Sequence, residues 1–118
     1  MKLYGIRIFV DDLDQAKLFY RDTLGLPVVW EMEGTAIGFD AGAQLIVEPV
    51  APDAGPEDRA LVGRFVGCSL QVDDIEETYR ALSATGVLFD SLPEKQFWGG
   101  TLAHFRDPSG NVLTLLGT

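Results

Sequence analysis

The sequence predicts an α+β fold made of two βαβββ modules, and three observations carry this prediction. A strand-like segment with two unlike faces, 5–10, runs directly into an amphipathic helix. The same order returns in the second half, where Val-Asp-Asp-Ile from Val72 repeats Val-Asp-Asp-Leu from Val10 at a distance of 62 residues. Three short strand-like segments follow each helix, so an internal duplication is the simplest explanation.

The first module covers about residues 1–50. Its first strand places Ile, Ile and Val on one face and Gly, Arg and Phe on the other. The helix that follows is expected to begin after Asp12, a good N-cap residue, and to stop at Gly25. Turn residues then separate three predicted strands at 26–31, 35–39 and 44–50.

The second module covers about residues 65–118 and repeats this order. A linker at 51–64, rich in Pro, Gly and acidic residues, joins the modules and is expected to hold a short helical turn. A strand at 67–72 leads into a helix that runs through Leu82 to Gly86, and strands follow at 87–90, 101–105 and 111–116. The chain, 1–118, is predicted to be a single domain because its length suits one core.

Composition narrows the class of protein. Hydrophobic residues make up 47% and charged residues 23%, as in ordinary globular chains. The formal net charge of −9 disfavours nucleic acids and anionic membrane surfaces as partners. No segment approaches the ~20 apolar residues that span a bilayer, and the single Cys68 has no partner for an internal disulfide. We therefore expect a cytoplasmic protein without nucleic-acid or membrane partners.

Two motifs carry a resemblance to a known family. The helix ends in Phe-Tyr-Arg-Asp-Thr-Leu-Gly-Leu from Phe19, and the last strand follows Asp-Pro-Ser-Gly-Asn from Asp107. At this separation they resemble the vicinal oxygen chelate superfamily, which includes glyoxalase I, extradiol dioxygenases and bleomycin-resistance proteins. The resemblance implies that the modules curl into a partly closed mixed sheet, with helices outside, the ligand inside and a homodimer as the common assembly.

The resemblance also locates the positions where relatives hold a divalent metal. In this sequence they correspond to Gly5, Glu48, Gly67 and Thr114. Glycine has no side chain to donate, a threonine hydroxyl is a poor ligand for transition metals, and one carboxylate does not make a site. We therefore expect a member of the family with no metal and no other cofactor.

Strand alternation assigns the residues that share a face with these positions. This face mixes charged, polar and aromatic side chains, which is typical of a ligand pocket, whereas the opposite faces are almost purely aliphatic. Trp98 precedes the seventh strand in a glycine-rich flap expected at the cavity mouth. The predicted ligand-binding residues are Arg7, Phe9, Gln44, Glu48, Ser69, Gln71, Trp98, Leu102, His104 and Thr114.

Each of these residues also has a structural interpretation. His104, the only histidine, suits acid-base chemistry, but it is also consistent with a half-buried side chain held by Glu48 or a backbone carbonyl. Glu48 and Arg7 can form a salt bridge that only holds shape, and Trp98 can pack on a dimer partner. The paired acids before each helix are predicted to be helix caps, and Cys68 to be an inert core thiol.

The sequence thus predicts a metal-independent, glyoxalase/bleomycin-resistance-like homodimer that binds a small organic molecule in the cleft between its modules. A glyoxalase-like lyase or isomerase remains the alternative. It would use His104 and Glu48 as an acid-base pair, with or without a divalent metal.

Overall fold

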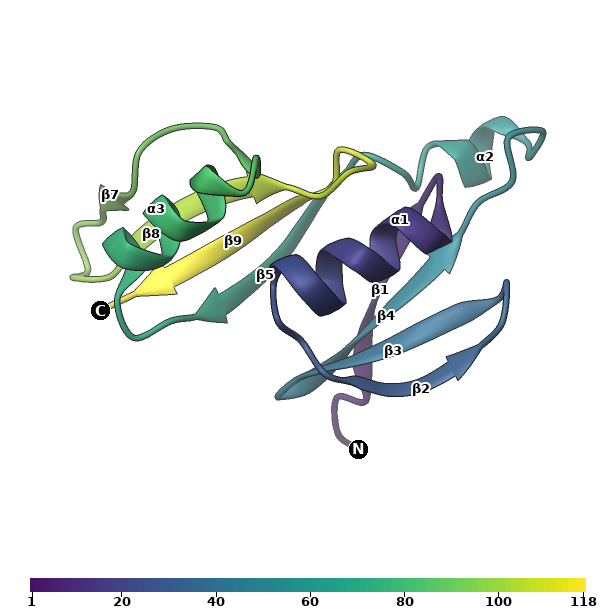
Figure 1. Ribbon diagram of the computed structural model, residues 1–118, viewed down its shortest axis with the longest axis horizontal. Coiled ribbons are helices and arrows are strands. Elements are labelled where there is room, and N and C mark those ends of the chain that lie inside the picture. Colours follow the sequence, from purple (N-terminus) through teal and green to yellow (C-terminus); the bar gives the residue numbers. More distant parts are fainter.

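The first module forms a four-stranded sheet covered by one helix (Figure 1). The computed structural model describes all residues, 1–118. Its strand order is β1-β4-β3-β2, with β1 parallel to β4 and the other neighbours antiparallel. The elements are β1 (Gly5–Val10), α1 (Leu13–Leu18), β2 (Val28–Met32), β3 (Ala36–Ala41) and β4 (Ala43–Pro49).

The second module repeats this topology with the order β5-β9-β8-β6, and an additional short strand, β7, pairs with β8. The elements are β5 (Phe65–Gln71), α3 (Ile75–Ala84), β6 (Leu88–Phe89), β7 (Glu94–Lys95), β8 (Thr101–Arg106) and β9 (Val112–Gly117). The linker holds the predicted helical turn as α2 (Pro56–Arg59). The βαβββ duplication is therefore confirmed, although the strand predicted at 87–90 shortens to β6 and β7 was not predicted.

The two sheets do not close into one. No strand of one module pairs with a strand of the other, and the only bridge outside the two sheets joins Phe9 of β1 to Val62 of the linker. The molecule is correspondingly elongated, with extents of 41 × 29 × 29 Å. The expectation of a partly closed sheet is thus corrected, because the linker residue Val62 and not β5 lies against β1.

Side-chain caps start both main helices. Asp12 Oδ1 accepts a hydrogen bond from the backbone N–H of Gln15 at 3.0 Å, and Asp74 Oδ1 accepts one from Glu77 at 3.1 Å. Asp11 instead pairs with Arg59 of α2 at 2.8 Å. The prediction that the paired acids are helix caps is confirmed for Asp12 and Asp74 and is wrong for Asp11 and Asp73, which make no cap hydrogen bond.

The first helix widens before it ends. After α1 the chain continues as a π-helical turn, η1 (Phe19–Thr23), and the N–H of Leu24 donates to the carbonyl of Phe19 at 2.9 Å. Phe19 and Tyr20 both enter the core from this turn, with exposed fractions of 8% and 0%. Phe19 lies 6.4 Å from the ring of Phe105 in the other module, so this turn joins the two halves.

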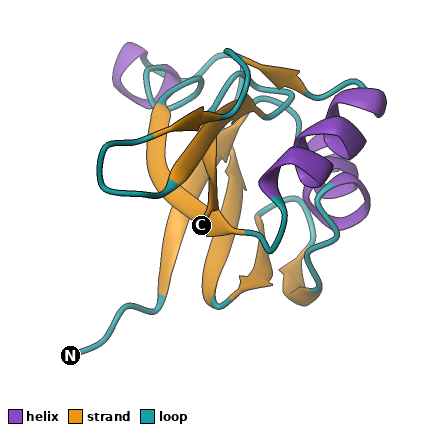
Figure 2. Cartoon of the chain, turned by 90° about the vertical axis from the view of Figure 1, so that its left-hand side faces the viewer, coloured by secondary structure: helices purple, strands orange, loops and turns teal.

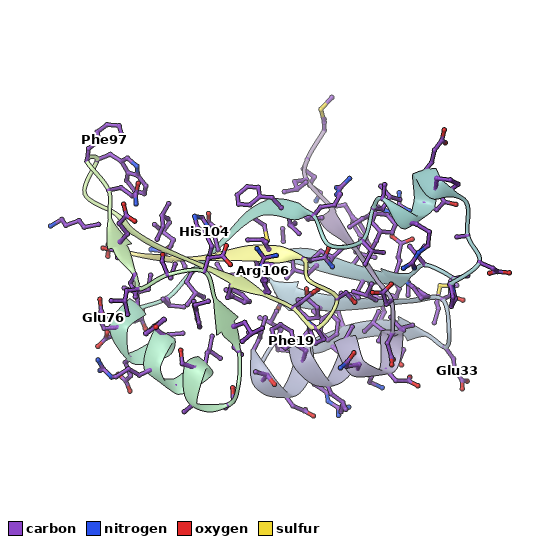
Figure 3. The ribbon with its side chains drawn as sticks, turned by 90° about the horizontal axis from the view of Figure 1, so that it is seen from above. Phe19, Glu33, Glu76, Phe97, His104 and Arg106 are labelled. Carbon is purple, nitrogen blue, oxygen red and sulfur yellow. The ribbon has the colours of Figure 1, made fainter.

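The helices α1 and α3 lie on the same side of the strands, and the core fills the space beneath them (Figures 2 and 3). The core includes Ile8 and Val47 from the first module and Ala103 and Phe105 from the second. Cys68 belongs to it, as predicted, and burial raises the pKa of its thiol. No helix combines the length and apolar character needed to cross a membrane.

A buried polar cluster fixes the junction between the modules. Asn111 is 1% exposed, and its side chain accepts from the N–H groups of Gly63 and Arg64 while donating to the carbonyl of Phe9. It also donates to Asp107, which accepts from the hydroxyl of Tyr20 at 2.7 Å. The Asp-Pro-Ser-Gly-Asn motif therefore holds both modules and the linker in one arrangement.

Candidate functional site

The faces of the two sheets opposite α1 and α3 carry most of the predicted ligand-binding side chains. We call this surface the open face, because neither of the two main helices, α1 and α3, covers it (Figure 3). The alternation of the strands explains it: Ile8 and Phe105 point into the core, so their neighbours Arg7 and His104 point the other way.

In the first module, β1 and β4 bring Arg7, Phe9 and Glu48 together. Arg7 donates to Glu48 twice, from Nε to Oε2 at 2.6 Å and from Nη2 to Oε1 at 3.0 Å. Its guanidinium also lies 5.2 Å from the centre of the Phe9 ring. Hydrogen bonding to Glu48 and the charge of that carboxylate raise the pKa of Arg7 above its ordinary value. The Arg7 side chain remains 63% exposed, so the pair is available to solvent or a ligand.

A tryptophan from β2 completes this half. The indole N–H of Trp30 donates to Gln44 Oε1 at 2.6 Å. The ring lies directly over Gly38 of β3, where a Cβ atom would collide with it. Glycine at this position therefore lets the indole lie flat on the sheet.

In the second module, His104 forms the centre of the open face. It pairs across the strands with Thr114, and His104 Nδ1 lies 2.8 Å from Thr114 Oγ1. The ring of Phe65 meets the imidazole edge-on at 5.8 Å and is itself 62% exposed. Thr114, 3% exposed, thus orients one imidazole nitrogen and leaves Nε2 without a hydrogen bond to protein. Leu102 lies two residues from His104 on the same strand and is half-buried.

The segment after β7 supplies exposed aromatic rings. Phe97 is fully exposed, at the tip of its loop in Figure 3, and Trp98 is 55% exposed. The Trp98 ring lies over Gly100, where a Cβ atom would collide with it. Indole rings over glycines therefore occur in both modules, as Trp30 on Gly38 of β3 and Trp98 on Gly100, which directly precedes β8.

The chain does not bring every predicted residue into one site. Glu48 is held by Arg7 and His104 by Thr114, and no hydrogen bond or ion pair joins Glu48 to His104. Ser69 and Gln71 line a different cavity, which lies between the modules along the edge of β5. The two candidate acid-base residues therefore belong to separate sheets with separate partners.

The sheet registers show which residues of the two modules occupy equivalent positions. Val72 repeats Val10, so Ser69 is the counterpart of Arg7; Arg7 pairs with Ile46 and Ser69 pairs with Thr114. By this register Ile46 is the counterpart of Thr114. Glu48, two residues further along the same face, is the counterpart of Leu116.

The side chains at these family positions do not fit a metal ion. A Cβ atom at Gly5 would lie 2.9 Å from the carbonyl oxygen of Gln44, and Gly67 has a φ of +77°, which disfavours any side chain. Ile46 offers no donor atom and Thr114 only a hydroxyl. No group of three or more His, Cys, Asp or Glu side chains is arranged to hold a metal ion.

Two residues of the open face were missing from the predicted binding set. Phe65 lies two residues before Gly67 and so shares its face by alternation, but the predicted strand began too late to include it. Trp30, like Trp98, is consistent in sequence with either ligand stacking or packing; its contact with Gly38 depends on the pairing of β2 with β3.

Comparison with known proteins identifies the class to which this fold and open face belong. The Glyoxalase/Bleomycin resistance protein/Dioxygenase superfamily model matches residues 3–115. The chain therefore belongs to this superfamily, which confirms the resemblance of its sequence motifs.

Individual relatives agree with this assignment. The chain is similar to the bleomycin resistance protein of Klebsiella pneumoniae, at 30% identity over 89% of this chain and 83% of that protein. A superfamily member from Sphaerobacter thermophilus DSM 20745 shares 31% identity and a TM-score of 0.81 over 100% of this chain and 98% of its own. TnmS3, an antibiotic binding protein from Streptomyces sp. CB03234, shares 28% identity and a TM-score of 0.74 over 99% and 95% of the two chains.

Proposed function

We propose that this protein binds a small organic molecule on its open face without a metal ion and without chemical change to the ligand. The observation that carries the proposal is the uncovered row of aromatic and polar side chains on both sheets. Phe65 is 62% exposed although its ring meets the half-buried His104, and Trp98, over Gly100, is 55% exposed. Such a surface is typical of a recognition site, since large apolar side chains are seldom gathered in the open without a partner.

The chemistry of the open face favours an aromatic, cationic guest. Phe65, Trp98 and Phe97 offer ring faces for stacking, and Trp98 is well suited to contact a cation. The only charges placed there by the predicted residues, Arg7 and Glu48, neutralise one another. The net charge of −9 also attracts cations to the protein as a whole. The similarity to a bleomycin resistance protein and to an antibiotic binding protein points in the same direction.

A second copy of the chain is expected to complete the site. The two sheets of one chain are not closed over the open face, and Met32 of β2, two residues beyond Trp30, remains 58% exposed. A homodimer would cover this apolar surface and enclose the ligand between a first module and a second module. In that assembly Glu48 of one copy and His104 of the other can line the same cavity.

Titration with metal-free bleomycin, followed by tryptophan fluorescence, tests the proposal. Trp98 and Trp30 lie at the open face and report on occupancy. We expect saturable quenching, and a loss of affinity of about tenfold for Phe65→Ala, which corresponds to about 1.4 kcal/mol. Leu18→Ala is the matched control, because Leu18 is an equally apolar, 54% exposed residue of α1 on the helix side. Equal affinity of the wild type and Phe65→Ala would contradict the proposal.

The second candidate function is a lyase or isomerase reaction that uses His104 and Glu48. One observation favours it: Thr114 holds Nδ1 of His104 while Nε2 is left without a partner, as a general acid or base requires. His104→Ala separates the two functions. It is expected to change affinity only, whereas loss of turnover of an identified substrate with unchanged affinity would establish catalysis.

A further inference from the structure

We propose that the cavity between the modules is a second ligand site, which takes a neutral and mainly apolar molecule carrying a carbonyl group. It lies between the end of η1 and α3, has a volume of about 580 Å³ and reaches the edge of β5. That volume falls within the ~300–1,000 Å³ typical of small-molecule sites. This site is separate from the open face, so it does not depend on the proposed function.

The lining of the cavity selects for neutral ligands. Seven of the ten lining residues are hydrophobic, and none carries a charge. Leu24 and Leu26 line it from the first module, and Leu82 and Leu115 from the second. An ion entering this cavity would lose water without gaining a counter-charge, so charged molecules are excluded. The open face carries Arg7, Glu48 and His104, so it does not exclude charged molecules in this way.

The edge of β5 gives the cavity its hydrogen-bonding groups. Ser69, Leu70, Gln71 and Val72 follow one another in the chain and all line the cavity. Consecutive residues point to opposite faces of a sheet, so they share a cavity only where it runs along the strand edge. No strand of the first module pairs with this edge, since β5 is the end strand of its sheet and pairs only with β9.

The direction of the backbone groups follows from the pairing of β5 with β9. The N–H of Val72 donates to the carbonyl of Leu116 at 2.9 Å, and Leu70 pairs with Leu115. In a parallel pair, alternate residues direct their N–H and C=O groups to the partner strand. Leu70 and Val72 therefore face β9, while the backbone N–H groups of Ser69 and Gln71 face the cavity. A ligand carbonyl can accept a hydrogen bond from either group.

Three polar residues complete the wall of the cavity. Ser69 and Gln71 border it at the edge of β5 and Thr78 lines it from α3, and the side chains of all three are free of hydrogen bonds within the protein. An apolar cavity with a few polar groups along one side is the usual design of a small-molecule site. The ligand is therefore expected to place its carbonyl against β5 and its apolar body against the leucines.

The neutral dye Prodan, which carries an apolar naphthalene body and one ketone, is the probe for this site. We expect saturable binding with one dye per chain and a blue shift of its emission. Ala41→Trp places an indole in the cavity from the last residue of β3, and it is expected to weaken binding at least about tenfold. Thr78→Phe blocks the same space from α3, so a folding defect in one variant does not decide the result.

A matched pair of substitutions at Gln71 tests the backbone donor. Gln71→Ala and Gln71→Pro both remove the side-chain amide, but only proline removes the N–H that faces the cavity. Proline is tolerated at an edge strand where that N–H makes no ladder bond. We expect Gln71→Pro to bind Prodan about fivefold more weakly than Gln71→Ala, as the loss of a hydrogen bond of about 1 kcal/mol implies.

Phe65→Ala distinguishes this site from the open face. Unchanged Prodan affinity in Phe65→Ala, together with weak binding by Ala41→Trp and Thr78→Phe, supports the inference. Loss of binding in Phe65→Ala with unchanged affinity in folded Ala41→Trp and Thr78→Phe overturns it and leaves the proposed function intact. Circular dichroism spectra that match the wild type establish that each variant is folded. Absence of saturable Prodan binding by the wild type also overturns the inference.

Discussion

Replacing Asn111 by alanine should destabilise the protein more than any single surface substitution, because this side chain joins three segments of the chain. It accepts from Gly63 and Arg64 in the linker and donates to Phe9 at the end of β1 and to Asp107. Three of these four hydrogen bonds involve neutral groups, worth about 1 kcal/mol each, and the bond to a carboxylate is worth about 1.5–3 kcal/mol.

The four contributions together give an expected loss of about 3–5 kcal/mol in the free energy of unfolding, allowing for some replacement by water. This is a large part of the roughly 5–15 kcal/mol typical of a domain. Urea unfolding followed by circular dichroism measures it, provided the m-value stays constant. Asn111→Asp keeps the acceptor but loses the donors and places a second carboxylate beside Asp107, so it should be at least as unstable.

Ser109→Ala is the control in the same turn. Ser109 Oγ accepts a single bond from the N–H of Asp11, so its removal should cost about 1 kcal/mol or less. A loss below about 1 kcal/mol for Asn111→Ala would refute the view that this side chain holds the modules together.

Three further predictions concern groups inside the fold. Burial, followed by the nearby Asp107 carboxylate, raises the pKa of Tyr20 well above its ordinary value. The contribution of Tyr20 to stability is therefore complete below about pH 10 and declines as the pH rises further, by up to about 1.4 kcal/mol per pH unit. Urea midpoints should fall less steeply between pH 9 and 11 in Tyr20→Phe than in the wild type. Gly67→Ala should cost about 1–2 kcal/mol because its φ is +77°, whereas Gly55→Ala, at φ −62° with nothing near its Cβ, should cost less than half as much; equal midpoints would contradict this. Burial raises the pKa of the Cys68 thiol, so an aromatic disulfide reagent should modify it only after unfolding, and rapid reaction of the native protein would show that it is accessible.

Much of the fold could be predicted because its signals are local. The carboxylates of Asp12 and Asp74 mark the helix starts, and each acts within three residues of its own position. Alternation separated the core side of β1 and β8 from the open face, since neighbouring side chains of a strand point to opposite sides. The same local signals revealed the duplication, because Val10 and Val72 begin the same sequence pattern.

Register could not be predicted in the same way. Glu48 and Ile46 lie on the same face of β4, so alternation does not distinguish them, and only the pairing with β1 shows which one matches Thr114. Similarly, Gly67 lies in the irregular part of β5, which concealed that the strand begins at Phe65. Pairing depends on contacts between segments that are distant in the chain.

The sequence by itself determined the two modules, their helix caps and the side chains available to the open face, because these depend on residue type and short-range spacing. Only the tertiary structure decided how those side chains are used. Arg7 pairs with Glu48 and His104 with Thr114 on separate sheets, and Ser69 and Gln71 border the cavity between the modules. These partnerships follow from strand register and from the packing of one module against the other, which no local pattern encodes.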